Sequence, residues 1–292
     1  MKVKLRPRLN PKILMKIRIS VFAVFFLFSC TSLRDTYPFC NFPEHSPFPG
    51  GVINKILFIK SSLKPEIKAE GKGVYLCQVD KHLWRALIPI NLFRDKNSID
   101  VFHNENLILN IPIENKAYRE SKITIDNQDM VSPPAEYLPR IKRETELSFK
   151  AINILTNTVL SSLKMSKPIE GLKSSEFGVR RFINNQPRNR HTGLDLAAPS
   201  GTEIRAPLSG KVVLIGNFYY RGNTVFLDHG GGLISTYSHL NDVLVQNQDL
   251  ITKNQIIGKV GQTGRVTGPH LHWQTILSGI PVDPELFLEE PL

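Results

Sequence analysis

The stretch GRVTGPHLHW, residues 264–273, places two histidines one residue apart behind a Gly-Pro corner. In an extended strand, alternate residues point to the same face, so His270 and His272 share a face while Leu271 turns toward a core. On a helix the same two side chains would diverge by about 200°. Pro269 and the nearby glycines disfavour a helix. The stretch therefore predicts a β-strand with two histidines on one side.

Short strand-like runs continue upstream of this stretch as far as Gly171. They are separated by glycine-rich corners and show almost no helical periodicity; they are KVVLIG, TVFLDH, LISTYSHL, DVLVQ and IIGKVG. Strands of this length with such corners are typical of an all-β unit. We therefore expect residues 171–292 to form one antiparallel β domain.

A second β region is predicted over residues 51–132. It alternates turn signals with short β-branched and aromatic runs, which are ILFIKSS, KGVYLCQVD, WRALIPINLF, SIDVFH, LILNIPI and SKITI. Several strands at this spacing favour a small antiparallel, Ig-like β-sandwich. The predicted fold class is thus mainly β, with two β units.

Residues 133–170 separate the two β units and begin with a Pro-Pro pair. From about Arg140 to Lys164, apolar residues recur at helical spacing, at Ile152, Leu155, Val159 and Leu163. This spacing predicts an amphipathic helix that connects the two units.

The N-terminus has the anatomy of an export signal. Seven basic residues precede the apolar stretch ISVFAVFFLFS, residues 19–29. This stretch is too short to cross a bilayer of about 30 Å as a helix, so residues 1–29 predict a cleaved signal peptide. The letters LFSC resemble a bacterial lipobox, in which Cys30 would carry a lipid; cleavage near Ser29 or Ser32 without lipid is the alternative. We expect an exported periplasmic protein anchored to a membrane by this lipid.

Residues 30–50, rich in proline and aromatic residues, are expected to form an extended leader. Cys40 and Cys77 lie in a compartment that permits disulfides. They either form a bridge or leave Cys77, in VYLCQV, as a small buried hydrophobic residue. Both interpretations stay open.

The net charge of +11 does not predict nucleic-acid binding. Seven of the positive charges lie in residues 1–29, which contain no acidic residue, and removing these residues leaves about +4. The remainder therefore lacks the strongly basic balance of a DNA-binding domain.

Histidines are concentrated in the C-terminal half: five of the eight lie between positions 191 and 272. His191 and Asp195 are separated by four residues in RHTGLDLAAPSGT, and His239 lies in TYSHL. Two imidazoles and a carboxylate suit zinc, and three protein ligands leave a fourth position open for water. Because the sequence has no HExxH, the histidines left over after ligation are the candidates for the general base.

The motifs HTGLD, TYSHL and TGPHLHW, in this order, resemble the signature of the lysostaphin-like (LytM-type) zinc metallopeptidases, which cut peptide cross-links in bacterial cell walls. The resemblance covers about Ser175 to Pro284 and includes FGVRR, GTEIRAPLSGKV and GNTVFLDHGGGLISTYSHL. Gln186 and Arg190 depart from the family pattern in the loop before His191, which bears on substrate fit. The upstream β region and helix resemble the layout of exported Gram-negative members.

This resemblance implies a site and an activity. One Zn²⁺ per chain would be bound by His191, Asp195 and His272, and the catalytic residues His239 and His270 would flank the fourth position. The chain would then be an endopeptidase whose partner is peptidoglycan. Which histidine is the base, which cross-link is cleaved and the oligomeric state do not follow from the sequence.

Two other functions compete with this one. Some relatives are non-catalytic scaffolds that activate cell-wall amidases, but those typically lose metal ligands, whereas all the expected ligands are present here. A β-sandwich adhesion or transport accessory has no feature in its favour. For His229 we expect a structural hydrogen bond rather than a functional role.

A run of arginines is either solvated or contacts carboxylates of wall peptides, namely Arg180, Arg181, Arg188 and Arg190.

Overall fold

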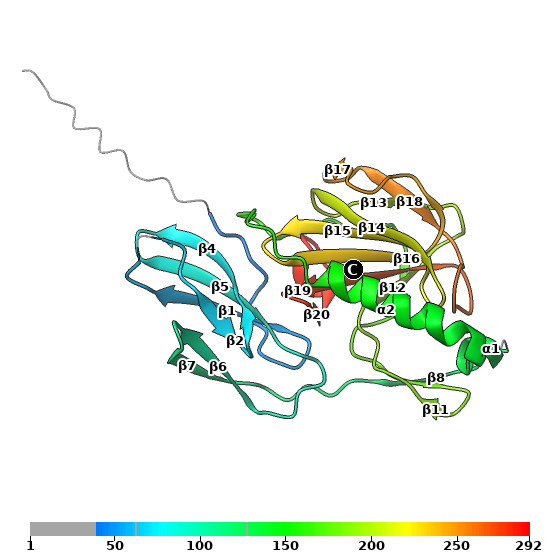
Figure 1. Cartoon of the computed structure of the whole chain (residues 1–292), viewed down its shortest axis with the longest axis horizontal. Coiled ribbons are helices and arrows are strands. Elements are labelled where there is room, and N and C mark those ends of the chain that lie inside the picture. The colour runs from blue at the N-terminus through cyan, green and yellow to red at the C-terminus, as the bar shows by residue number, and fades with distance from the viewer. Residues whose placement is uncertain (1–38, 62, 127) are drawn as a thin grey trace, which may run out of the picture. The chain divides into compact units, whose positions relative to one another are not determined.

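The computed structural model describes residues 39–292, except residues 62 and 127 (Figure 1). The predicted signal peptide, residues 1–29, and the predicted lipidation site Cys30 lie outside these residues. Within the described part of the chain, no helix is long and apolar enough to cross a membrane.

The C-terminal half forms a ten-stranded antiparallel sheet. Its main path runs in the order β17 (Leu250–Ile251), β14 (Gly210–Phe218), β15 (Gly222–Gly230), β16 (Leu233–Val243), β19 (His270–Leu277), β12 (Leu194–Ala197) and β9 (Leu172–Ser175). Three strands pair beside this path, β13 (Glu203–Arg205), β18 (Ile256–Val260) and β20 (Ile280–Val282). The predicted antiparallel β unit is confirmed. Its strands are rich in Val, Ile and Leu. Side chains on one face, such as Val225 and Leu227, belong to the main core, and Phe226 between them belongs to a separate apolar cluster.

Two smaller sheets form the N-terminal β region. One has the order β1 (Val52–Phe58), β5 (Leu83–Pro89) and β4 (Tyr75–Asp80); the other has the order β3 (Lys72–Gly73), β2 (Ile67–Ala69), β6 (Ser98–His103) and β7 (Asn106–Pro112). Buried side chains from both sheets share one apolar core, for example Ile53, Trp84 and Ile99. The Ig-like character of this region stays a prediction.

A third small sheet joins distant segments. It contains β11 (Gln186–Pro187), β10 (Arg180–Ile183) and β8 (Glu120–Ile123), and β10 pairs with β8 in parallel. The chain then continues from β8 into α1 (Gln128–Val131) and the 3-10 helix η1 (Ala135–Tyr137). This pairing brings the segment before α1 beside the loop that leads to His191.

The connecting helix is shorter than predicted. Helix α2 spans Leu138–Ile152, so the prediction of a helix as far as Lys164 is wrong beyond Ile152. Asn153 ends the helix with non-helical dihedrals, and its side-chain amide donates to the carbonyl of Phe149. Beyond Asn153 the backbone pairs with other segments of the chain, as in the bridge between Met165 and Leu288. These pairings satisfy backbone N–H and C=O groups that would otherwise form the hydrogen bonds of a helix.

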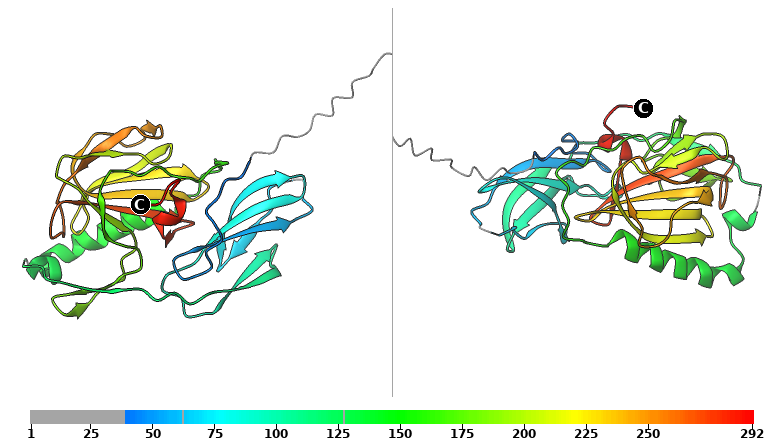
Figure 2. Two further views of the ribbon diagram at one scale, coloured as in Figure 1. Left: turned by 180° about the vertical axis from the view of Figure 1, so that it is seen from behind. Right: turned by 90° about the horizontal axis from the view of Figure 1, so that it is seen from above.

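Helix α2 packs along the C-terminal sheet, as both views in Figure 2 show. Arg140 donates to the carbonyl of Asn217 at the end of β14, and Glu144 accepts from the backbone nitrogen of Tyr219. Ala151 contributes to an apolar cluster with Phe218 and Phe226.

Residues 39–50 are the described part of the predicted leader. Cys40 and Phe42 are buried. Cys40 forms a disulfide with Cys77 of β4, which decides between the two interpretations of these cysteines. One bond therefore joins the leader to the N-terminal β region.

Candidate active site

Strand register assembles the centre of the site. Asp195 on β12 lies directly opposite His272 on β19, and His272 in turn lies opposite Ser238 on β16. Leu271 is fully buried, whereas the His270 and His272 side chains are 17% and 13% exposed. The predicted alternation along this strand is confirmed.

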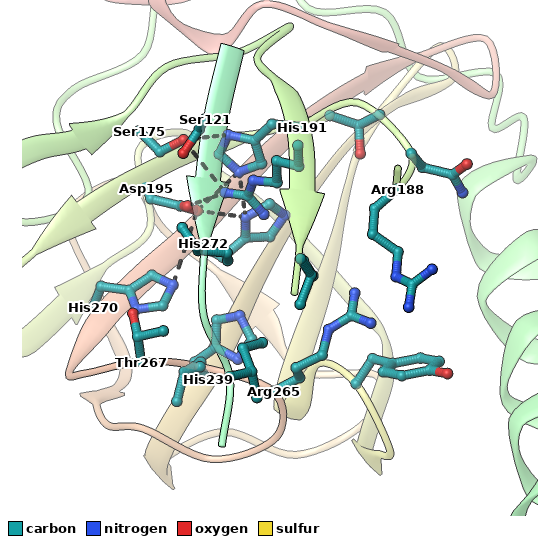
Figure 3. A pocket seen from close by; sticks show the side chains of 18 of the residues that line it. Ser121, Ser175, Arg188, His191, Asp195, His239, Arg265, Thr267, His270 and His272 are labelled. Carbon is teal, nitrogen blue, oxygen red and sulfur yellow. Dashed lines mark hydrogen bonds and ion pairs between the residues drawn. The ribbon is translucent and has the colours of Figure 1, made fainter. Parts of the chain in front are cut away.

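Three side chains converge at this point, those of His191, Asp195 and His272 (Figure 3). His191 Nε2 lies 2.9 Å from Asp195 Oδ1, and His272 Nδ1 lies 2.7 Å from the same oxygen. The two imidazole nitrogens are 3.0 Å apart. One ligand atom from each residue lies within 4.8 Å of the others, which is a spacing that could hold one metal ion.

The outer contacts of this group orient it for ligation. His191 Nδ1 lies 2.8 Å from the carbonyl oxygen of Glu176. Because that oxygen only accepts, Nδ1 carries the hydrogen and Nε2 keeps its lone pair for a ligand. Arg181 donates to Asp195 Oδ2 at 2.5 Å, which leaves Oδ1 facing the histidines.

His239 and His270 lie beside this group, and each ring directs its Nδ1 toward a backbone carbonyl oxygen. His239 Nδ1 is 2.8 Å from the carbonyl oxygen of Thr263, and His270 Nδ1 is 2.9 Å from that of Gly268. Each Nε2 is therefore left as the free nitrogen. The two ring centroids are 4.8 Å apart, and His270 Nε2 is 4.0 Å from Asp195 Oδ1.

His239 has a backbone conformation that is uncommon for a residue with a side chain. Its φ is +69°, in the left-handed region, and its backbone nitrogen donates to the carbonyl of Arg221 at 2.9 Å. Such a conformation costs about 1–3 kcal/mol and persists where the surroundings fix it. It turns the imidazole toward the site from a strand whose register shifts at this point.

Burial dominates the electrostatics of the site. Burial of Asp195 opposes its ionisation, but the close polar contacts of its carboxylate with His191 and His272 outweigh this effect and hold its pKa well below the usual range. Burial lowers the pKa of His272 to about 3 and that of His239 well below its ordinary value, with the neighbouring histidines adding to the shift of His239. These two imidazoles are neutral near pH 7, the form in which a ring nitrogen can bind a metal or accept a proton.

The group opens into a pocket of about 1000 Å³. Five arginines line it, namely Arg181, Arg188, Arg190, Arg221 and Arg265. Among the described residues of the lining, Asp195 is the one acid. The pocket is therefore strongly basic apart from the paired Asp195.

The other residues singled out in the sequence lie outside the centre. His229 on β15 is buried, with Nδ1 against the carbonyl of Ser209 and Nε2 against the hydroxyl of Ser235. Arg180 is absent from the lining and pairs with Glu120 on the surface. The run of arginines is therefore neither wholly solvated nor wholly in the pocket.

Sequence reasoning missed Arg221 and Arg265. Arg221 is the residue before Gly222, and Arg265 lies inside TGRVTG between two recognised motifs. The available signal was an arginine next to a glycine in each segment. Their contacts with residues far away in the chain carried no local pattern.

Comparison with known proteins finds relatives of the region that holds the site and relatives of most of the chain. The model of peptidase family M23 matches residues 189–284. The DD-carboxypeptidase/endopeptidase Mpg of Neisseria meningitidis is 40% identical over 111 residues, which are 38% of this chain and 26% of that protein. The peptidoglycan DD-endopeptidase ShyA of Vibrio cholerae is 43% identical over 111 residues, with the same coverage of 38% and 26%. The matched region thus spans about a quarter of the length of these curated relatives.

One solved structure matches nearly end to end. It is a crystal structure of a Pseudomonas aeruginosa protein assigned to peptidase M23, 32% identical, with a TM-score of 0.65, covering 83% of this chain and 95% of that chain. The family model and this similarity, which covers 83% of the chain, lead to one conclusion: the chain belongs to peptidase family M23.

Proposed function

We propose that this chain is a zinc-dependent endopeptidase that hydrolyses peptide cross-links of bacterial peptidoglycan. The observation that carries the proposal is the convergence of His191, Asp195 and His272 within 4.8 Å, with the free nitrogens of two further histidines beside them. The endopeptidase names of the Mpg and ShyA relatives support the substrate class.

The donor set fits zinc. Two neutral imidazole nitrogens and one carboxylate oxygen are ligands that zinc accepts, and three protein ligands are typical of a catalytic rather than a structural site. The contacts of His191 with Glu176 and of Asp195 with Arg181 are the outer partners that such ligands need. When bound, zinc supplies a Lewis acid that polarises the scissile carbonyl and makes water acidic enough to attack near neutral pH.

The chain's own residues perform the proton transfers. His239 and His270 hold their Nε2 atoms toward the pocket, so one accepts the proton of the attacking water and returns it to the departing amine. The other, when protonated, donates a hydrogen bond to the oxyanion of the tetrahedral intermediate. Both assignments of the two roles fit the orientation of the rings.

The proposal also includes the domain organisation of the chain. We propose a lipoprotein-type signal peptide at residues 1–29, a leader at 30–50, a β-sandwich domain at 51–132, a linker at 133–170 and the metallopeptidase domain at 171–292. The lipobox-like LFSC supports export to the periplasm with a lipid on Cys30.

The alternative is a non-catalytic scaffold that activates cell-wall amidases. The complete donor set and both flanking histidines favour the enzyme, because a scaffold needs neither. Digestion of purified sacculi with and without a chelator, followed by mass analysis of the released muropeptides, tests the choice. We expect chelator-sensitive release of cross-link fragments; intact sacculi after incubation with the zinc-loaded protein would support the scaffold.

A further inference from the structure

We propose that Arg188 and Arg265 together bind a carboxylate of the peptide substrate, beside the bond that is hydrolysed. This inference rests on the proposed function and deepens it. It assigns a specificity site to two residues outside the metal and histidine group, and it defines the substrate as a peptide with a free carboxylate.

Both guanidinium groups are fixed by the same short segment. Arg188 Nη2 donates to the carbonyl oxygen of Val131 at 2.9 Å, and Arg265 Nη1 donates to that of Met130 at 3.3 Å. These acceptors are consecutive residues of α1, so the two side chains are held next to each other. Figure 3 shows both on the same side of the pocket, to the right of the histidines.

Additional contacts hold each arginine without neutralising it. The Arg265 guanidinium lies 4.4 Å from the centroid of the Tyr220 ring, and Arg188 donates to the side-chain oxygen of Gln186 at 2.6 Å. Carbonyl, amide and aromatic partners fix the geometry but carry no negative charge. The pair is therefore preorganised, and among the residues that the structure describes no ion pair with an acid compensates its charge.

The electrostatics of the pocket favour an anion at this place. Burial lowers the pKa of Arg265, and the charges of Arg188 and Arg181 lower it further, so these cations repel one another. The acid of the described lining, Asp195, is already paired with Arg181. An anion from the ligand would relieve the repulsion between Arg188 and Arg265.

The lining of the pocket favours a carboxylate at the end of a short alkyl chain. A guanidinium fork matches the two oxygens of a carboxylate, and such bonds are among the strongest hydrogen bonds in proteins. Beside the arginines the pocket is lined by apolar side chains that could pack against a stem, namely Ile123, Ile125, Val131 and Ile183. A peptide whose acidic group ends a short alkyl chain fits both features.

The test compares two substrates. They are a purified muropeptide dimer with free carboxylates and the same dimer with those carboxylates amidated. We expect the wild-type protein to prefer the free acid by about tenfold or more in kcat/KM. Arg188→Gln and Arg265→Gln should each raise KM for the free acid by about tenfold and leave the amidated dimer unaffected.

Matched variants separate recognition from folding. Arg180→Gln removes a charge from the same strand region but outside the pocket lining, where Arg180 pairs with Glu120, so it should keep the preference. Thermal unfolding of every variant checks that the fold is retained. An equal loss on both dimers by a folded Arg265→Gln protein would overturn the inference, as would inorganic phosphate competing as well as the free-acid dimer does.

A binding experiment keeps this inference separate from the proposed activity. Calorimetric titration of both dimers into the zinc-loaded His270→Ala protein measures recognition without hydrolysis. Selective binding of the free acid by this variant, together with a wild-type protein that hydrolyses neither dimer, would contradict the activity and keep the carboxylate site. Hydrolysis of both dimers at equal rates by the wild-type protein would keep the activity and contradict the carboxylate site.

Discussion

The pocket has two walls that are built in different ways. The strand wall consists of β12, β16 and β19, which carry Asp195, His239, His270 and His272, and its positions are set by backbone pairing such as that of Asp195 with His272. The arginine wall consists of Arg188, Arg265 and the segments that hold them, and its positions are set by side chains that reach backbone carbonyls. The proposed chemistry is thus built mainly on the rigid sheet and the proposed recognition on the connections between strands.

The arginine wall depends on contacts between segments distant in sequence. Asn184 is an example: its side chain exchanges two hydrogen bonds with the backbone of Ile125, each 2.9 Å long. A change in the segment around Ile125 should therefore move the arginine wall and leave the strand wall in place. Variants that affect one wall but not the other break or sharpen this comparison.

The largest effect is expected for His270→Ala in the strand wall. Removing a group that transfers the proton should lower kcat by about 10²–10⁴-fold. Because His270 is outside the proposed metal-binding group of His191, Asp195 and His272, bound zinc should stay near one per chain. Hydrolysis of purified peptidoglycan and metal analysis of the same sample measure the two quantities.

A histidine elsewhere provides the control for this variant. His45 accepts a hydrogen bond from the backbone of Asn54 in the N-terminal β region, so His45→Ala should keep full activity. Undiminished hydrolysis by His270→Ala would refute its catalytic role. Loss of zinc together with activity would move it into the metal-binding group.

Arg181→Met is expected to have the next largest effect, because Arg181 connects the two walls. It comes from β10, next to the loop of the arginine wall, yet its guanidinium contacts Asp195. Without this partner the carboxylate loses its fixed orientation, and zinc affinity should fall by about 10–100-fold. Competition with a chromophoric chelator measures the affinity directly.

The neighbouring Arg180→Met is the matched variant. Its ion pair with Glu120 is exposed, at 55% and 49% of the two side chains, and contributes little. Zinc affinity should therefore stay at the wild-type value. If both variants bind zinc equally well, the strand wall holds Asp195 without help from the arginine side.

The strand wall could be predicted from the sequence, whereas of the arginine wall only Arg188 was marked, within a run of four arginines. Strand alternation placed His270 and His272 on one face, and local motifs marked His191, Asp195 and His239. The contact of Arg265 with Met130 spans 135 residues, so it left no periodic or local signal. The helix prediction failed for a related reason. Leu155 and Leu163 have helical spacing in the sequence, but the backbone beyond Asn153 forms hydrogen bonds with distant segments instead of continuing the helix.

The smallest effect concerns His229, a histidine of the same sheet that belongs to neither wall. It is 3% exposed, and burial lowers its pKa to about 4. Above about pH 6.5 the imidazole is neutral in both the folded and the unfolded chain. Below that pH the unfolded chain binds the proton first, so the free energy of unfolding falls as the pH is lowered toward 4.

His229→Gln removes this proton binding and should retain polar contacts with Ser209 and Ser235. Between pH 8 and pH 5.5, the wild-type protein should lose about 1.4 kcal/mol more unfolding free energy than the variant. Urea unfolding of both proteins at both pH values gives this difference, in which other titrating groups cancel. An equal loss in the two proteins would mean that His229 becomes protonated without cost, and its burial would then no longer distinguish it from the histidines that face the pocket.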